Sequence, residues 1–209
     1  MTRLAILDLD GTLLDTLDDL AASVNAALVA VGLPARARAE IERFVGEGAR
    51  TLVSRAVAPH AELVEPALAA WWSHYRDHGL DRTRPFAGLP ELLTRSDRRL
   101  AVHTNKPGAL ARQLLSGLGL LDRFAIVTGG DEAPRKPSPA GTLAIMRRLG
   151  ARARDTIFIG DSPTDVRTAR AAGVTLVGVT WGFRPEAELR AAGARHVVDT
   201  VAGLAPWLA

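Results

Sequence analysis

The chain of 209 residues contains no cysteine and no long hydrophobic run. The absence of cysteine excludes disulfide bonds, thiolate catalysis and cysteine-ligated zinc. No stretch approaches the roughly 18 consecutive apolar residues of a transmembrane helix, so none is indicated. The first predicted strand begins at residue 4, which leaves no room for a signal peptide. We therefore expect a cytoplasmic protein without membrane partners.

Lysine is also scarce. Only two of the 26 basic residues are lysines, Lys106 and Lys136. A lysine ammonium is a compact point charge that arginine does not replace at a tight site, so both positions are candidates for a binding site. Chance placement is the alternative for each. The net charge of +3 comes from arginines scattered along the chain rather than gathered in a block, which argues against nucleic-acid binding.

The chain begins with a short apolar run that leads into Asp8, Asp10 and Gly11. This pattern predicts a buried strand over residues 4–10, whose carboxyl end is where an open parallel sheet places its ligands. Asp8 and Asp10 could converge there, unless the chain has already left the strand. Two neighbouring carboxylates favour a cation between them, and Mg²⁺ prefers oxygen ligands and phosphates. An ordinary Asp-rich turn is the alternative.

The next stretch of the chain is a predicted all-helical block. Apolar residues recur there at helical spacing, and Trp71 and Tyr75 fit the packed face of the last helix. Thr16 and Asp19 have the spacing of a capping box, with aspartate in place of the usual glutamate. The predicted helices cover residues 16–31, 37–45 and 49–57, and a fourth ends at Gly79.

After a linker at residues 83–88, strands alternate with helices. This alternation predicts a parallel sheet with helices on both faces, to which the first strand also belongs. The fold class is therefore α/β, with a core of residues 1–15 and 84–209 and a helical insertion of residues 16–83. Further strands are predicted at residues 100–104, 125–128, 156–160, 175–180 and 196–198.

Polar residues follow the predicted strands at their carboxyl ends, which lie along one edge of a parallel sheet. Thr104 and Asn105 follow the second strand, Lys136 precedes a helix, and Asp161 and Asp165 follow the fourth strand. Together with the first two aspartates, this set fits phosphoryl transfer, which requires charge neutralisation and in-line positioning. Taken singly, Thr104 could be a strand-end cap, Lys136 a solvated helix start and Asp161 a helix N-cap.

These segments, in this order, resemble the four motifs of the haloacid dehalogenase superfamily. They are residues 8–13, Thr104, Lys136-Pro137 and residues 160–165. The likeness spans nearly the whole chain, and the insertion resembles the helical cap of that superfamily's first cap class. The resemblance implies a Rossmann-like doubly wound parallel sheet core with an inserted all-helical cap. Residues 44–50 and 104–107 resemble the bacterial phosphoglycolate phosphatase branch.

The resemblance implies a role for each matching residue. Asp8 corresponds to the nucleophile and Asp10 to the general acid and base. Thr104 and Lys136 correspond to phosphate-binding positions, and backbone groups near Asn105 are expected to contribute. Mg²⁺ is the expected cofactor, with a ligand set drawn from Asp8, Asp10 through its backbone, Asp161 and Asp165.

The expected activity is Mg²⁺-dependent hydrolysis of a small phosphomonoester, foremost 2-phosphoglycolate, through an aspartyl-phosphate. A pyrophosphatase, a sugar-phosphate phosphatase or mutase, and a non-catalytic interaction module are the alternatives. A dehalogenase would typically lack an aspartate at position 10, and a phosphonatase would require a lysine in the cap, where the chain has none. The expected partner is a small phosphorylated metabolite, and the protein is expected to be a monomer or homodimer.

Substrate specificity is expected to lie in the cap, at Arg43, Glu47 and above all Arg50. Gly46 and Gly48 allow a tight turn between cap helices. The residues that follow begin a helix, whose N-terminus favours anions. The planar guanidinium of Arg50 suits a carboxylate, so we expect Arg50 to bind an anionic end of the substrate. A solvated helix residue is the alternative.

Overall fold

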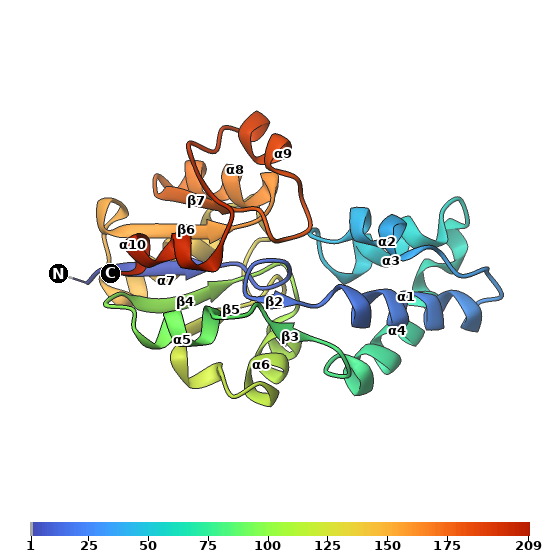
Figure 1. The fold of residues 1–209 in the computed structure, drawn as a ribbon. Helices are drawn as coiled ribbons and strands as arrows, with labels where there is room; N and C mark the ends of the chain where they lie inside the picture. The colour runs from blue at the N-terminus through green and yellow to red at the C-terminus, as the bar shows by residue number, and fades with distance from the viewer. Residues whose placement is uncertain (1) are drawn as a thin grey trace.

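Six short, mostly apolar strands form the central sheet of the core. The computed structural model describes residues 2–209. The strands are all parallel. The carboxyl ends of the three central strands point toward the cap (Figure 1). The order across the sheet is β5 (Ile126–Thr128), β4 (Arg99–His103), β1 (Leu4–Leu7), β6 (Thr156–Gly160), β7 (Thr175–Val179) and β8 (His196–Val198).

Helices cover both faces of this sheet because successive strand side chains point to opposite sides. On one face, Leu7 and Val102 belong to a cluster with residues of α5 (Leu89–Thr94), α6 (Gly108–Gly117) and α10 (Ala205–Leu208). On the other, Ile6 and Phe158 pack with α7 (Ala140–Leu149), α8 (Pro163–Ala172) and α9 (Glu186–Ala192). The doubly wound α/β fold expected from the sequence is confirmed, although α5 and α10 were not predicted.

The cap is a four-helix lobe beside the carboxyl edge of the sheet (Figure 1). Its helices bury a separate apolar cluster that includes Trp71 and Tyr75. Leu110 of α6 joins this cluster, so the cap also packs against the core. The helices are α1 (Leu17–Ala30), α2 (Arg38–Phe44), α3 (Ala49–Val57) and α4 (Val64–His78).

Two short strands carry the chain into and out of the cap. β2 (Leu14–Asp15) pairs antiparallel with β3 (Arg84–Pro85). Beside them, the carboxylate of Asp19 accepts hydrogen bonds from the amides of Arg82 and Thr83. The predicted capping box is therefore wrong. Asp19 binds the returning chain instead, and the Thr16 side chain makes no cap hydrogen bond.

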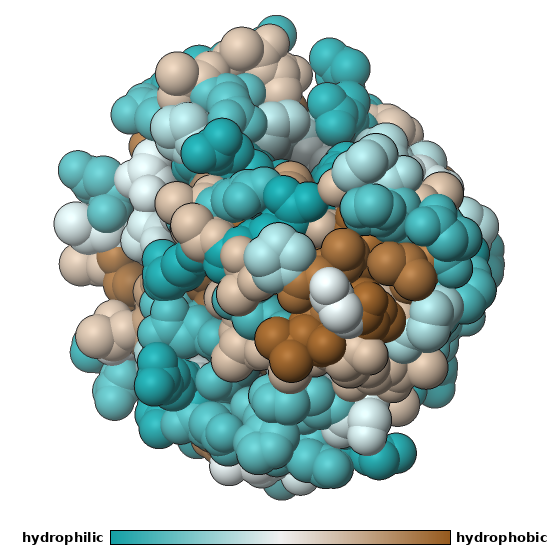
Figure 2. Space-filling model, turned by 90° about the vertical axis from the view of Figure 1, so that its right-hand side faces the viewer, coloured by the Kyte–Doolittle hydropathy of each residue, from teal (hydrophilic) through white to brown (hydrophobic). Residues whose placement is uncertain are grey.

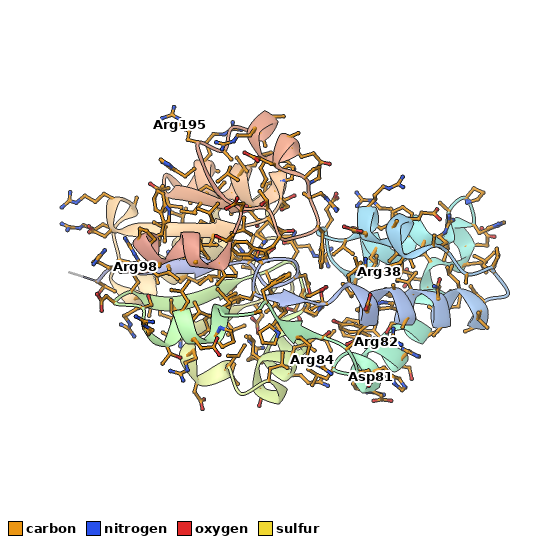
Figure 3. All side chains as sticks on the ribbon, viewed as in Figure 1. Arg38, Asp81, Arg82, Arg84, Arg98 and Arg195 are labelled. Atoms are coloured by element: carbon orange, nitrogen blue, oxygen red, sulfur yellow. The ribbon has the colours of Figure 1, made fainter. Side chains whose placement is uncertain are left out.

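The outer surface carries dispersed arginines. Arg98 and Arg195 lie on the core and Arg38 on the cap, while Arg82 and Arg84 lie together where the chain returns from the cap (Figure 3). Figure 2, which faces the cap end of the molecule, shows an apolar patch surrounded by polar side chains. No helix within residues 2–209 is long and apolar enough to cross a membrane.

Candidate active site

Asp8 lies directly after β1, at the centre of the sheet edge. Its backbone N–H donates to the carbonyl of Ile159 (2.9 Å), so strand pairing fixes its position. The chain then turns at Gly11, whose φ is +80°. A Cβ at Gly11 would overlap the carboxylate of Asp161, so the close approach requires glycine. The predicted strand is therefore too long, because Asp10 already belongs to this turn.

Three carboxylates and one ammonium meet at the ends of β1 and β6. Carboxylate oxygens of Asp8, Asp161 and Asp165 lie within 4.8 Å of one another, and all three residues are buried. The Nζ atom of Lys136 lies 2.8 Å from Oδ1 of Asp8 and 2.7 Å from Oδ1 of Asp165. The fold therefore brings together four predicted site residues from three segments of the chain.

Two of these aspartates are held by the surrounding loops. The carboxylate of Asp161 accepts hydrogen bonds from the Thr12 hydroxyl (3.1 Å) and the Phe183 amide (2.8 Å). Oδ2 of Asp165 accepts from the hydroxyl (2.6 Å) and amide (3.1 Å) of Ser162, which is the N-cap of α8. Both oxygens of Asp165 are thus engaged, one by the capping box and one by the ammonium. This arrangement makes Asp165 a group that orients its neighbours.

The electrostatics of this cluster favour a bound cation. Burial raises the pKa of Asp8 to about 8, with Lys136 opposing the shift and Asp165 adding to it. Burial and the charge of Asp165 raise the pKa of Asp161 to about 7. Burial disfavours the charge of Lys136, but Asp165 and Asp8 outweigh it and raise its pKa. An oxygen-ligated Mg²⁺ fits this excess of carboxylates.

Asp10 is not a member of this cluster and pairs with Lys106 instead. The Nζ atom of Lys106 lies 2.9 Å from Oδ1 and 3.2 Å from Oδ2 of Asp10. The Thr16 hydroxyl also donates to Oδ1 of Asp10 (2.7 Å). Lys106 is only 5% exposed, and its Nζ lies 4.6 Å from the ring centroid of Tyr75 in the cap. The scarcity of lysine made Lys106 a candidate binding residue in the sequence, but no motif assigned it a specific role.

Thr104 and Asn105 lie at the end of β4, next to the cluster. The buried hydroxyl of Thr104 accepts from the amide of Lys106 (3.1 Å). The Asn105 side chain accepts from the amide of Lys136 (2.7 Å) and donates to its carbonyl (3.1 Å). It also donates to the carbonyl of Gly46 in the cap (3.0 Å). Asn105 therefore fixes the lysine-bearing loop and connects it to the cap.

A pocket lined by residues of both the core and the cap opens beside these groups. Arg184, from the loop after β7, lines it and donates to the cap carbonyls of Glu42 (3.0 Å) and Val45 (2.6 Å). The sequence reasoning did not find Arg184, because no pattern in the sequence links this loop to α2. The lining residues are Asp8, Asp10, Leu20, Val45, Gly46, Gly48, Ala49, Leu52, Trp71, Thr104, Asn105, Lys106, Pro107, Asp161, Ser162, Phe183 and Arg184.

The three predicted specificity residues of the cap lie outside this lining. Arg50 forms an ion pair with Glu65, and its side chain is 56% exposed. Glu47 pairs with Arg55 at 2.6 Å. Arg43 offers only its backbone carbonyl to the core. The structure therefore does not bring these side chains to the acidic cluster.

A family model described as haloacid dehalogenase-like hydrolase matches residues 5–179. The chain belongs to this family. The match covers both lobes and every residue of the acidic cluster.

Similar proteins indicate which kind of hydrolase this is. A phosphoglycolate phosphatase of Rhodospirillum rubrum is 39% identical over 221 residues, covering 100% of this chain and 91% of that protein. One from Agrobacterium fabrum is 38% identical over 220 residues, covering 100% and 93%. A crystal structure of a "predicted phosphoglycolate phosphatase" from Haemophilus somnus superposes with a TM-score of 0.92 at 29% identity, covering 99% and 97%. This haloacid dehalogenase-like hydrolase is thus a phosphoric monoester hydrolase that resembles phosphoglycolate phosphatases.

Proposed function

We propose that the enzyme hydrolyses 2-phosphoglycolate in a Mg²⁺-dependent reaction that passes through an aspartyl-phosphate on Asp8. The observation that carries the proposal is the buried acidic cluster of Asp8, Asp161 and Asp165, in which the ammonium of Lys136 pairs with Asp8 and Asp165. Asp10 lies beside it and faces the same pocket. This arrangement supplies a nucleophile, a proton carrier and positive charge within one buried site.

The chemistry requires two displacements at phosphorus. A carboxylate oxygen of Asp8 forms a bond to phosphorus while the bond to the ester oxygen breaks, and Asp10 donates a proton to that oxygen. Asp10 then removes a proton from the water that attacks the aspartyl-phosphate. The bond between phosphorus and Asp8 breaks, which releases phosphate and regenerates the carboxylate.

Lys136 and the end of β4 prepare the site for a phosphoryl group. The Lys136 ammonium contacts Asp8 directly, so it offsets charge on the nucleophile and on phosphate oxygens beside it. Thr104 offers a buried hydroxyl at the same edge, next to backbone amides. The Asn105 side chain hydrogen-bonds both the amide and the carbonyl of Lys136, which fixes the position of the residue that carries the ammonium.

The residues that would hold Mg²⁺ are Asp8, Asp161 and the backbone of Asp10, while Asp165 holds Lys136 and Ser162 beside them. Bound there, Mg²⁺ neutralises charge on the phosphoryl oxygens. We choose 2-phosphoglycolate as the proposed substrate because the relatives are named phosphoglycolate phosphatases. The proposed partner is therefore a small phosphorylated metabolite, and neither a nucleic acid nor a membrane is proposed.

Two substitutions and a substrate panel test this proposal. Asp8→Asn should keep the fold and lower turnover by several orders of magnitude, because it removes the nucleophile. Asp10→Asn should slow turnover by about 10²–10⁴-fold, the usual contribution of a general acid and base. Steady-state assays would compare 2-phosphoglycolate, pyrophosphate and sugar phosphates. Residual Asp8→Asn activity within tenfold of wild type would refute the assignment of Asp8 as nucleophile. A higher kcat/KM for a sugar phosphate than for 2-phosphoglycolate would refute the proposed substrate.

A further inference from the structure

The charged side chains that line the pocket come from the core and not from the cap. The cap residues in the pocket lining are uncharged, namely Leu20, Val45, Gly46, Gly48, Ala49, Leu52 and Trp71. Among the described lining residues, the cations are Lys106 and Arg184. The Arg184 guanidinium donates to the carbonyls of Glu42, Arg43 and Val45, and so serves the cap backbone. Lys106 instead pairs with Asp10, which itself lines the pocket, so the charge of Lys106 lies at the pocket wall.

The cap contributes one buried polar side chain to the same pocket lining. Trp71 lines the pocket and is 1% exposed, yet its indole Nε1 has no hydrogen-bond partner among the described residues. A buried donor without an acceptor is costly, so a ligand that supplies the acceptor gains from the contact. The Trp71 ring stacks on Tyr75 with centroids 4.8 Å apart, and Tyr75 in turn contacts the Lys106 ammonium. The indole and the ammonium therefore belong to one contiguous group.

We propose that Lys106 and Trp71 form a subsite for a carboxylate on the substrate's leaving group. The inference rests on the proposed function and deepens it. Lys106 contacts Asp10, the group that protonates the ester oxygen. In a phosphorylated 2-hydroxy acid, the carboxylate carbon lies two bonds beyond that oxygen. A carboxylate so close to the ester oxygen is within reach of the ammonium beside Asp10, while the apolar cap residues exclude water around it.

The test compares 2-phosphoglycolate with ethyl phosphate, which has the same two-carbon leaving group without the carboxylate. Trp71→Phe keeps an aromatic ring and removes the N–H. It should lower kcat/KM for 2-phosphoglycolate about tenfold or more, as expected for a hydrogen bond to a charged group, and change ethyl phosphate little. Trp72→Phe is the matched control, because this adjacent indole is 37% exposed and absent from the pocket lining. It should leave both substrates unchanged.

A binding measurement and a second variant complete the experiment. In the Asp8→Asn background, titration calorimetry with Mg²⁺ should show weaker 2-phosphoglycolate binding when Trp71 is also phenylalanine. Lys106→Gln should lower kcat/KM for 2-phosphoglycolate more than for ethyl phosphate, although it also disturbs Asp10. Equal losses for both substrates in both variants, or no loss, would overturn the subsite while phosphatase turnover persists. A wild-type enzyme with no turnover of any phosphate ester would instead overturn the proposed function.

Discussion

Replacing Lys136 with methionine removes the ammonium from a cluster of three buried carboxylates. Lys136 is 4% exposed and forms ion pairs of 2.8 Å and 2.7 Å with Asp8 and Asp165. Removing one partner of a buried ion pair costs about 3–5 kcal/mol, because the remaining charges lose their compensation. We expect a loss of that size in the free energy of unfolding, measured by urea denaturation in EDTA at pH 8.

The loss should depend on pH in a defined direction. The pKa values of Asp8 and Asp161 are already raised, to about 8 and about 7, so the folded protein binds protons that the unfolded chain releases. Their contribution to stability is therefore present below about pH 4 and is lost as the pH rises toward 8. Without Lys136, ionising the buried carboxylates costs more free energy. Lys136→Met should therefore lower the free energy of unfolding more at pH 8 than at pH 5.

A surface ion pair provides the matched control. Arg38 and Asp18 lie 2.6 Å apart, with side chains 53% and 44% exposed. Arg38→Met should cost only about 0–1 kcal/mol at either pH, as exposed pairs do. Replacing EDTA by Mg²⁺ at about 100 times its dissociation constant should raise the free energy of unfolding of the wild type by roughly 2.7 kcal/mol. A loss below about 1 kcal/mol for Lys136→Met at pH 8, or an equal loss at both pH values, would refute the reasoning.

Three further predictions concern the metal and the cap. EDTA should abolish turnover and Mg²⁺ should restore it, while Ca²⁺ should substitute poorly; full activity after metal removal would contradict the site. The apparent Mg²⁺ affinity should rise between pH 6 and pH 8, because protons on Asp8 and Asp161 compete with the metal, and calorimetry would detect their release. Arg184→Ala should lower kcat/KM about tenfold through lost contacts with the cap, whereas the exposed Arg50→Ala should match wild type. An equal effect of both arginine variants would count against this assignment.

Local sequence patterns determined most of the fold. The run before Asp8 is apolar because β1 is buried on both faces, and the strand–helix alternation predicts a parallel sheet covered by helices. The site residues at strand ends were also predictable, since parallel strands bring their carboxyl ends to one edge. Asp8, Lys136, Asp161 and Asp165 meet for that reason.

Tertiary structure decided what faces the pocket, because those contacts join segments far apart in the chain. Thr16 and Asp19 read locally as a helix cap, but Thr16 binds Asp10, and Asp19 binds the chain that returns from the cap. Arg50 follows a glycine turn that looks suited to an anion, yet its helix carries it outward to Glu65. Lys106 and Trp71 line the same pocket because Tyr75 of α4 lies against the Lys106 ammonium just after β4. Periodicity shows which residues are buried, and only the packing of the cap on the core shows which of them line the pocket.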